Sequence, residues 1–512
     1  MKFFQRFPIH PLILGLYPPL MLLAVNINET RFSSGFRASA VSFLAATLLY
    51  LLLRLFIKDW HRAALLTSLV LIWFFAYGHL YLFLKQITIF GFIPGRHRLL
   101  LPLWFALLGV GVWVVLKRVK QPENVTMPLN LITGLLLIFP VIQLINFEFA
   151  VGRADAEEAA EIVKTESVVG PQRDVYYIIL DAYSRDDTLQ DFYEYDNAAF
   201  LEELNARGFY VGMCSRSNYP KTRLSLSSTL NMNYLEELDI TENNHDMEAW
   251  RAIRRSETRK RFEQRGYRVI AFETGFYWTE WESADIYFTR ADDPLGVFTD
   301  VQAASRLNNF ETIFLNTSLG RAVLDLEPFL ADNFVSFVNE SPRQDQYERV
   351  NYTLDTLPKL AQMPEAKFVF AHVLIPHGPY VFGPDGEFRA QDDERGYQDQ
   401  VTYINTRILE IIDEILANSA TPPVIIIQGD HGGPGTQPYP FRMNILNAYY
   451  LPDDGNQRLY PAITPVNTFR VIFDTYFGTE YGLIEDVSYY STEEDFFNFE
   501  IYPDTRPGCS GN

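Results

Sequence analysis

The sequence predicts an N-terminal α-helical transmembrane bundle followed by a C-terminal α/β domain with a mostly parallel central sheet. Long apolar stretches crowd the first 147 residues, and each is roughly long enough to cross a bilayer. From residue 174 onward, short apolar runs alternate with amphipathic helical stretches, which is the pattern of strands connected by helices. Several of these runs end in a polar side chain, as strands do at the active sites of open α/β sheets.

Composition excludes one class of function. The chain has 512 residues, a formal net charge of −20 and 48% hydrophobic residues. So acidic a chain is not expected to bind nucleic acid, because backbone phosphates require clustered lysine and arginine. The only two cysteines, Cys214 and Cys509, exclude a disulfide framework and a CxxC zinc motif. Whether they form one bridge stays open, since that depends on the compartment.

The membrane part contains five predicted spans, and a span needs about 20 residues. They lie near 10–27, 38–57, 63–84, 99–116 and 127–147. The first is short and contains three prolines. Eight lysines and arginines on the N-terminal side against six on the other favour a cytoplasmic N-terminus. Five crossings then predict an integral protein of the plasma membrane whose large domain is extracytoplasmic.

The spans serve as an anchor in this interpretation, because none carries Asp, Glu or Lys near its middle, as an ion-translocating bundle would. Residues 1–147 form the anchor, and 148–173 are an Ala- and Glu-rich connection, either a short helix or a linker. Residues 174–480 are the predicted catalytic domain. Residues 481–512 form an acidic, aromatic tail to which no chemistry is assigned.

Four predicted strands bring polar side chains toward one edge of the sheet. The strands lie at 175–180, 267–272, 367–374 and from 424 onward, with 447–452 as an edge strand. The polar residues at or after their ends are Asp181, Glu273, His372 with His377, and Asp430 with His431. Because the carboxyl ends of parallel strands meet at one edge, we expect these side chains to share one site.

The stretch Val424–Gly433, VIIIQGDHGG, is the most informative of these. Four aliphatic residues predict a strand buried on both faces. Asp430 and His431 follow it and are both metal-ligand types. The alternative is an ordinary surface turn, where Asp and Gly are common.

A nucleophile is predicted in the segment 217–235, where Pro220 indicates a turn before a helix. A hydroxyl at a helix N-terminus is favoured as an alkoxide by the helix dipole, although most such residues are ordinary N-caps. The residues alone leave five candidates open: Thr222, Ser225, Ser227, Ser228 and Thr229.

The order of these pieces resembles the alkaline phosphatase superfamily, in its sulfatase-like branch with lipoteichoic acid synthases and phosphoethanolamine transferases. The pieces are a strand-end acid (Asp181), a threonine after a turn (Thr222), a histidine in IPHGPY (His377) and a late GDHG. The resemblance covers roughly 174–475. A five-span anchor before an extracytoplasmic catalytic domain is also similar to those membrane transferases.

The resemblance implies that Asp181, Thr222, Asp430 and His431 hold one divalent metal ion and that Thr222 is the nucleophile. Zinc or manganese is expected, with calcium and magnesium left open. A second zinc site is not expected, because no histidine follows His431. Asp181 departs from lipoteichoic acid synthases, which have Glu there.

The resemblance also implies substrate contacts. His377 is similar to the histidine that contacts phosphoryl oxygens or the leaving group, with His372 as the alternative. Further contacts are implied by a loose match in FETGFYW at Glu273, Thr274 and Trp278. The chemistry of Arg442 alone allows two interpretations: it binds a phosphoryl group through two hydrogen bonds, or it forms a surface salt bridge. Formylglycine sulfatase chemistry is not expected, because Cys214 lies in CSRSNYP, outside a C/S-x-P-x-R segment.

These observations predict a membrane-anchored, metal-dependent phosphoester transferase or hydrolase with a covalent threonine intermediate. The expected partners are a membrane lipid or lipid-linked donor and an envelope glycan or lipid acceptor. The alternatives are a sulfuric or phosphoric ester hydrolase and an inactive envelope scaffold.

Overall fold

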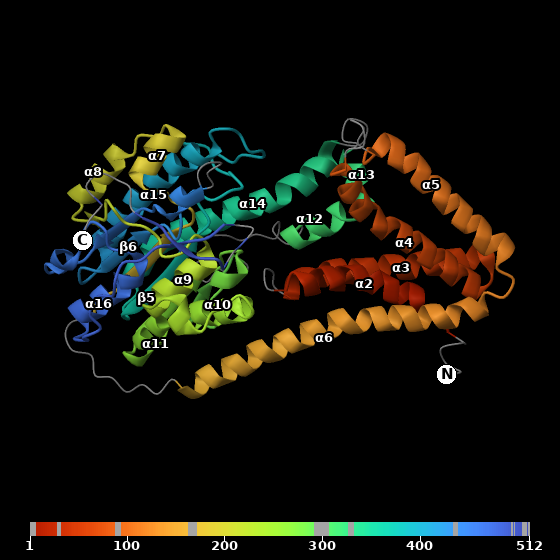
Figure 1. Cartoon of the computed structure of the whole chain (residues 1–512), viewed down its shortest axis with the longest axis horizontal. Coiled ribbons are helices and arrows are strands. Elements are labelled where there is room, and N and C mark those ends of the chain that lie inside the picture. The colour runs from red at the N-terminus through yellow and green to blue at the C-terminus, as the bar shows by residue number, and fades with distance from the viewer. Residues whose placement is uncertain are drawn as a thin grey trace. The chain divides into compact units, whose positions relative to one another are not determined.

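The computed structural model divides into two compact units (Figure 1). The membrane unit comprises Met1–Ala156 and Ser305–Pro342, and the α/β unit comprises Glu157–Ala304 and Arg343–Asn512. The structure describes residues 7–27, 32–87, 94–161, 172–290, 307–325, 332–433, 439–492, 495, 497–503 and 509. Parts of the predicted linker (162–171) and tail (493–494, 496, 504–508, 510–512) lie outside these residues.

The membrane unit is helical. Its long helices are α2 (His10–Val25), α3 (Phe36–Ile57), α4 (Trp60–Lys85), α5 (His97–Trp113) and α6 (Glu123–Glu161). By length and composition, four of the predicted spans fall on helices that can cross a membrane, those of α3 to α6. The first prediction falls on α2, whose 16 residues are shorter than the roughly 20 of a typical span. The beginning of the predicted linker, through residue 161, continues α6.

Two short helices from later in the chain belong to the membrane unit, α12 (Asn309–Asn316) and α13 (Gly320–Asp325). Phe310 of α12 packs with Leu23 and Leu144 of the apolar bundle. The buried Glu311 forms an ion pair with Arg37. The backbone N–H of Leu319 donates to the carbonyl of Phe74 at 2.8 Å. The contacts therefore group this segment with the membrane helices, although sequence reasoning placed it inside the range 174–480.

The α/β unit is built on a seven-stranded sheet with the order β2-β7-β6-β1-β5-β3-β4. Four of its pairings are parallel, and the two that involve β7 are antiparallel, which confirms the predicted fold class. The strands are β1 (Val175–Leu180), β2 (Tyr210–Val211), β3 (Arg268–Phe272), β4 (Ile286–Phe288), β5 (Lys367–Val373), β6 (Val424–Gln428) and β7 (Asn447–Tyr450). A separate hairpin pairs β8 (Tyr489–Tyr490) with β9 (Glu500–Ile501).

One strand prediction is wrong in position. The segment 447–452 was expected at the edge of the sheet, but β7 lies between β6 and β2. The edge is formed by β2, whose two residues are too few to show a strand period in the sequence. At the other edge, β4 extends the sheet beyond β3 by three residues.

Helices cover both faces of the sheet (Figure 1). The covering helices are α7 (Asp186–Tyr193), α8 (Ala198–Ala206), α9 (Thr222–Asn231), α11 (Glu257–Gln264), the part of α14 (Asp332–Thr356) from residue 343 onward, α15 (Gly396–Asn418) and α16 (Thr468–Tyr476). Helix α10 (His245–Arg254) packs on α9. Alternate residues of β1 serve the two faces: Ile178 packs in the cluster with α8 and α15, whereas Tyr177 meets Phe469 of α16 edge-on at 5.2 Å. Since β1 is completely buried, a continuous apolar run is what it requires.

Candidate active site

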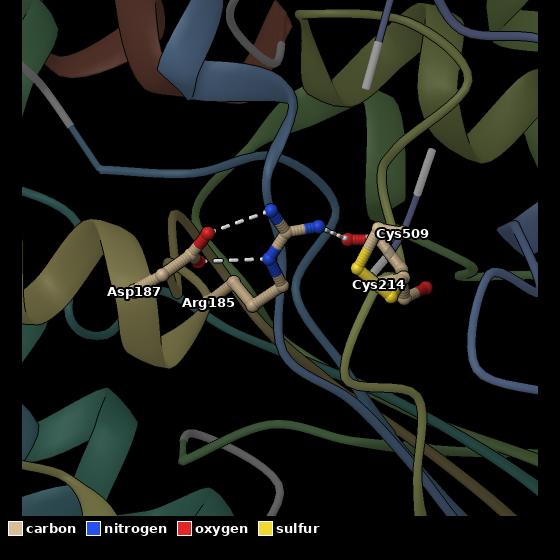
Figure 2. Close-up of a disulfide and its surroundings, with 5 residues drawn as sticks. Arg185, Asp187, Cys214 and Cys509 are labelled. Atoms are coloured by element: carbon tan, nitrogen blue, oxygen red, sulfur yellow. Dashed lines mark hydrogen bonds and ion pairs between the residues drawn. A yellow bond between two sulfur atoms is a disulfide. The ribbon is translucent and has the colours of Figure 1, made fainter. Parts of the chain in front are cut away.

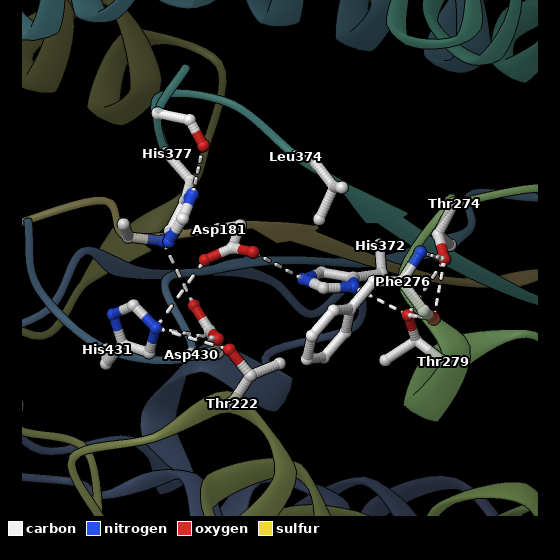
Figure 3. A network of polar contacts seen from close by, with 12 residues as sticks. Asp181, Thr222, Thr274, Phe276, Thr279, His372, Leu374, His377, Asp430 and His431 are labelled. Carbon is white, nitrogen blue, oxygen red and sulfur yellow. Dashed lines mark hydrogen bonds and ion pairs between the residues drawn. The ribbon is translucent and has the colours of Figure 1, made fainter. Parts of the chain in front are cut away.

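Three neighbouring strands deliver the candidate catalytic side chains to one edge of the sheet. Asp181 follows β1, Asp430 and His431 follow β6, and His372 lies near the end of β5. Because β6, β1 and β5 are adjacent and parallel, their carboxyl ends meet there. Figure 3 shows these side chains converging, with Thr222 of α9 approaching from the opposite side.

Asp181, Asp430 and His431 form a buried group that could hold a metal ion. One ligand atom from each lies within 4.8 Å of the others. The Nε2 atom of His431 is 3.6 Å from Asp181 Oδ1 and 3.5 Å from Asp430 Oδ2. The hydroxyl of Thr222 lies 3.2 Å from the same Nε2 atom. Carboxylate oxygen, imidazole nitrogen and hydroxyl oxygen together make a donor set suited to a divalent transition metal.

Unpaired atoms support this use of the group. Asp181 Oδ1 and Asp430 Oδ2 are buried and have no hydrogen-bond partner. The other oxygen of Asp430 accepts from the backbone N–H of Ala182 at 3.1 Å, so only one side of this carboxyl group is satisfied by the protein. Leaving a buried acidic oxygen unpaired is unfavourable. A cation at this point would pair both atoms, so the residues present fit a metal ion.

The tautomer of His431 also fits a ligand. Its Nδ1 lies 2.9 Å from the carbonyl of Gly432, which can only accept. Its Nε2 lies 3.0 Å from Nη2 of Arg442, which can only donate. Both contacts therefore require a hydrogen on Nδ1 and a lone pair on Nε2. Nε2 is also the nitrogen near the two acidic side chains, so a metal ion bound there would take the place of the Arg442 contact, and the carbonyl at Nδ1 would hold the ring as in other metal-ligating histidines.

The pKa values of Asp181 and His431 leave a negative charge in the buried ligand group, which is called the centre below. Burial raises the pKa of Asp181, but the nearby His377 and His372 lower it by more, so this pKa lies well below its usual range. Burial, assisted by the positive charge of Arg442, lowers the pKa of His431 to about 4. At neutral pH an ionised carboxylate therefore faces a neutral imidazole, a combination that attracts a cation.

Close backbone packing shapes the loops at the strand ends. Ala182, directly after Asp181, has φ of 66°, a left-handed conformation that is unfavourable for a non-glycine residue. Its carbonyl accepts from the hydroxyl of Tyr397 at 2.8 Å, which helps to hold the turn. A Cβ atom at Gly429 would lie 2.5 Å from the carbonyl oxygen of Tyr183. The glycine before Asp430 is thus needed for this close approach.

The structure distinguishes among the five candidate hydroxyl groups. Ser227, Ser228 and Thr229 donate to backbone carbonyls around their own helix. Ser225 is buried without a hydrogen-bond partner. Thr222, the first residue of α9, is the one of the five whose hydroxyl contacts His431. Its position at the helix N-terminus places it where the dipole favours negative charge.

The two histidines of the segment after β5 have different surroundings. His372 is buried; its Nδ1 lies 2.9 Å from the hydroxyl of Thr279, and its Nε2 is 3.4 Å from Asp181 Oδ2. His377 is partly exposed, and its backbone N–H donates to the carbonyl of Asp181 at 3.0 Å. The rings of His377 and His431 are 6.3 Å apart. His377 is therefore the one of the pair at the open side of the centre.

Arg442 lies inside this region. Besides its contact with His431, its Nε donates to the carbonyl of Pro220 at 2.7 Å. Pro220 precedes Thr222 by two residues. The guanidinium group thus links the loop after β6 to the turn before the candidate nucleophile.

The remaining predicted substrate contacts, Glu273 and Trp278, each lie beside an arginine. Glu273 pairs with Arg290 at 3.9 Å. Trp278 is buried, with the guanidinium group of Arg223 5.0 Å from the centre of its ring. Trp278 therefore packs next to the start of α9. Thr279, which sequence reasoning did not select, connects this segment to His372; its place one residue beyond the FETGFYW match was the only signal.

Comparisons with known proteins give structural matches only. No protein-family model and no curated protein sequence matches the chain. The C-terminal periplasmic domain of EcEptC from Escherichia coli matches with 12% identity and a TM-score of 0.42, over 66% of this chain and 95% of that one. The corresponding domain of phosphoethanolamine transferase EptC from Campylobacter jejuni matches with 11% identity and a TM-score of 0.35, over 62% and 93%.

A full-length membrane protein also matches. Lipooligosaccharide phosphoethanolamine transferase A (EptA) from Neisseria meningitidis has 12% identity and a TM-score of 0.33, over 88% of this chain and 89% of that one.

Proposed function

We propose that this protein is a membrane-anchored, metal-dependent enzyme that transfers or hydrolyses a phosphoester group through a covalent intermediate on Thr222. The observation that carries the proposal is the Thr222 hydroxyl beside three buried ligand-type residues, two of which have unpaired oxygen atoms. Nucleophile, ligands and an adjacent guanidinium group are what phosphoryl transfer through a threonine requires.

Each residue has a role in the proposed reaction. Asp181, Asp430 and His431, with Thr222 itself, hold one divalent ion, zinc or manganese by their chemistry. When bound, such an ion lowers the pKa of a hydroxyl group and neutralises charge on phosphoryl oxygens. The Oγ1 atom of Thr222 forms a bond to phosphorus while the bond from phosphorus to the leaving oxygen breaks.

The second half of the reaction restores the threonine. An acceptor hydroxyl, or water in hydrolysis, forms the new bond to phosphorus as the bond to Thr222 breaks. His377, at the open side of the centre, is placed to give a proton to the leaving oxygen of the donor and to take one from the acceptor. Arg442 is placed to contact phosphoryl oxygens.

The compartment follows from the cysteines. Cys214 and Cys509, left open by the sequence, form a disulfide with 5.5 Å between their Cα atoms. Disulfides persist in oxidising compartments outside the cytoplasm. This supports an extracytoplasmic α/β unit, where a membrane lipid or lipid-linked molecule would be the donor and an envelope glycan or lipid the acceptor.

The test is substitution of the nucleophile. In detergent, Thr222→Ala should lower turnover of a chromogenic phosphodiester by at least about 10³-fold, because no other residue replaces a covalent nucleophile. Ser225→Ala, which alters a buried hydroxyl group on the same helix, should retain turnover.

Mass spectrometry of the wild-type protein after incubation with membrane lipids should find phosphorus on Thr222. Product analysis with and without an alcohol acceptor separates transfer from hydrolysis. Normal turnover by Thr222→Ala would disprove the assignment.

A further inference from the structure

The C-terminal tail, here residues 485–509, packs against the segment that leads to Thr222. Sequence reasoning assigned it no chemistry. In the described residues its β8–β9 hairpin contacts the nucleophile turn, defined as residues 217–222. The turn and the tail are more than 260 positions apart in the sequence, so only folding brings them together.

Asn218 is the polar contact between them. It is completely buried. Its side-chain Nδ2 donates to the carbonyl of Val487 at 2.8 Å, and its own carbonyl accepts from the backbone N–H of Tyr489 at 2.8 Å. Its Oδ1 accepts from the backbone N–H of Val466. The backbone at Asn218 is thus held on one side by the tail and on another by the chain before α16.

Tyr219 is the apolar contact. Its ring is stacked on Tyr489 with centroids 5.5 Å apart, and Phe499 meets it edge-on at 5.3 Å. Its hydroxyl accepts from the backbone N–H of Leu235 at 3.0 Å, which fixes the ring at its far end. A tyrosine buried between two aromatic rings of the tail therefore lies three residues before Thr222.

Covalent and polar links hold the neighbouring chain. Cys214 is joined to Cys509 of the tail (Figure 2). Arg185, which follows the Asp181 turn, donates to the carbonyl of Ser215 at 3.1 Å. Arg216 donates to the carbonyl of Tyr502 at 2.6 Å. The links continue along the chain from the disulfide to the nucleophile turn.

We propose that the C-terminal tail, closed by the Cys214–Cys509 disulfide, is a positioning element that fixes the nucleophile turn so that Thr222 faces the ligand group. Arg442 holds Pro220 from the side of the centre, and the tail holds Asn218 and Tyr219 from the other side. Misplacement of a reacting group by about 1 Å can lower a rate about 10²-fold. The expected effect on reaction rate rests on the proposed role of Thr222. The expected effect on how firmly the nucleophile turn is held does not.

The test compares three single variants of the full chain in detergent. Tyr489→Ala removes the stacked ring, and Tyr489→Phe retains it. Ile501→Ala is the control, because Ile501 belongs to the same hairpin but is 70% exposed. Hydrogen–deuterium exchange of residues 217–226 measures how firmly the turn is held, and single-turnover labelling of Thr222 by the chromogenic phosphodiester measures the covalent step.

We expect Tyr489→Ala to speed exchange in residues 217–226 and to slow labelling of Thr222 at least tenfold, with KM within twofold of the wild type. Tyr489→Phe and Ile501→Ala should match the wild type within twofold in both measurements. Bound metal should stay unchanged in all three, since a general loss of folding would lower it.

The double variant Cys214→Ser with Cys509→Ser provides a second route if Tyr489→Ala does not fold. It should also speed exchange in the turn and slow labelling. Unchanged exchange and unchanged labelling in the folded variants would overturn the inference. If wild-type Thr222 is never labelled while Tyr489→Ala still speeds exchange, the proposed function fails but the tail's hold on the turn stands.

Discussion

Two groups of charged side chains gather at strand ends of the sheet, a partly buried one after β3 and β4 and a buried one after β1 and β6, and they balance charge in opposite ways. At β3 and β4, the guanidinium group of Arg290 faces Asp345, Glu348 at 3.5 Å and Glu273 at 3.9 Å. At β1 and β6, Asp181 and Asp430 face a neutral imidazole. Acids in the first group already have a cation from the protein. In the described residues, the two acids of the second group have no ion pair with a lysine or arginine, so this is the group that we propose holds the metal ion.

Removing an acid from the second group should have the largest effect. We expect Asp430→Asn to lose bound metal and to lower turnover of the chromogenic phosphodiester by about 10³-fold or more, because ligand and nucleophile act as a unit. Elemental analysis and kinetics measure the two effects. Glu273→Gln in the first group is the control and should keep its metal; loss of metal there would contradict the distinction between the groups.

Removing the cation from the first group should reduce stability rather than metal binding. Arg290→Met removes the guanidinium group that faces Glu273 and Glu348 and one of the two that pair with Asp345, which keeps Arg349. Because these acids are partly exposed, we expect a loss of about 1–2 kcal/mol in the free energy of unfolding of the α/β unit. Denaturant unfolding measures it. If the folded variant lost as much bound metal as Asp430→Asn, the two groups would be coupled.

Withdrawing the metal should destabilise only a protein with an intact second group. An ion present at 100 times its Kd contributes about 2.7 kcal/mol to stability. Chelation should therefore lower the Tm of the wild-type protein and leave that of Asp181→Asn unchanged. An identical shift in both proteins would place the ion elsewhere.

The smallest effect is expected between the groups, at Thr279. Its hydroxyl contacts Nδ1 of His372, whose other nitrogen lies near Asp181. Thr279→Val keeps the shape and removes this hydrogen bond, so we expect turnover to fall by about tenfold, equivalent to about 1.4 kcal/mol. Thr258→Val is the matched variant, because it changes a buried hydroxyl group on α11 that has no hydrogen-bond partner; a similar fall there would argue against a specific role for Thr279.

Much of the fold could be predicted because its strands are buried on both faces. The range of β1 matches its prediction residue for residue, and β3, β5 and β6 lie within theirs. Such strands need unbroken apolar runs, which are visible in the sequence. Two-residue β2 and three-residue β4 carry no comparable pattern, and without β2 the segment of β7 was taken for the edge.

The sequence by itself determined which strands end in Asp181 and in Asp430 with His431, because strand burial and the residues that follow are local properties. Local residue patterns did not distinguish Thr222 from four other hydroxyl groups, although the family resemblance named it. Its contact with His431, which joins residues 209 positions apart, belongs to the tertiary structure. The Cys214–Cys509 bridge and the packing of the tail on Tyr219 were decided in the same way. A local pattern records how a residue is buried, but which distant residue it meets depends on the topology of the whole sheet.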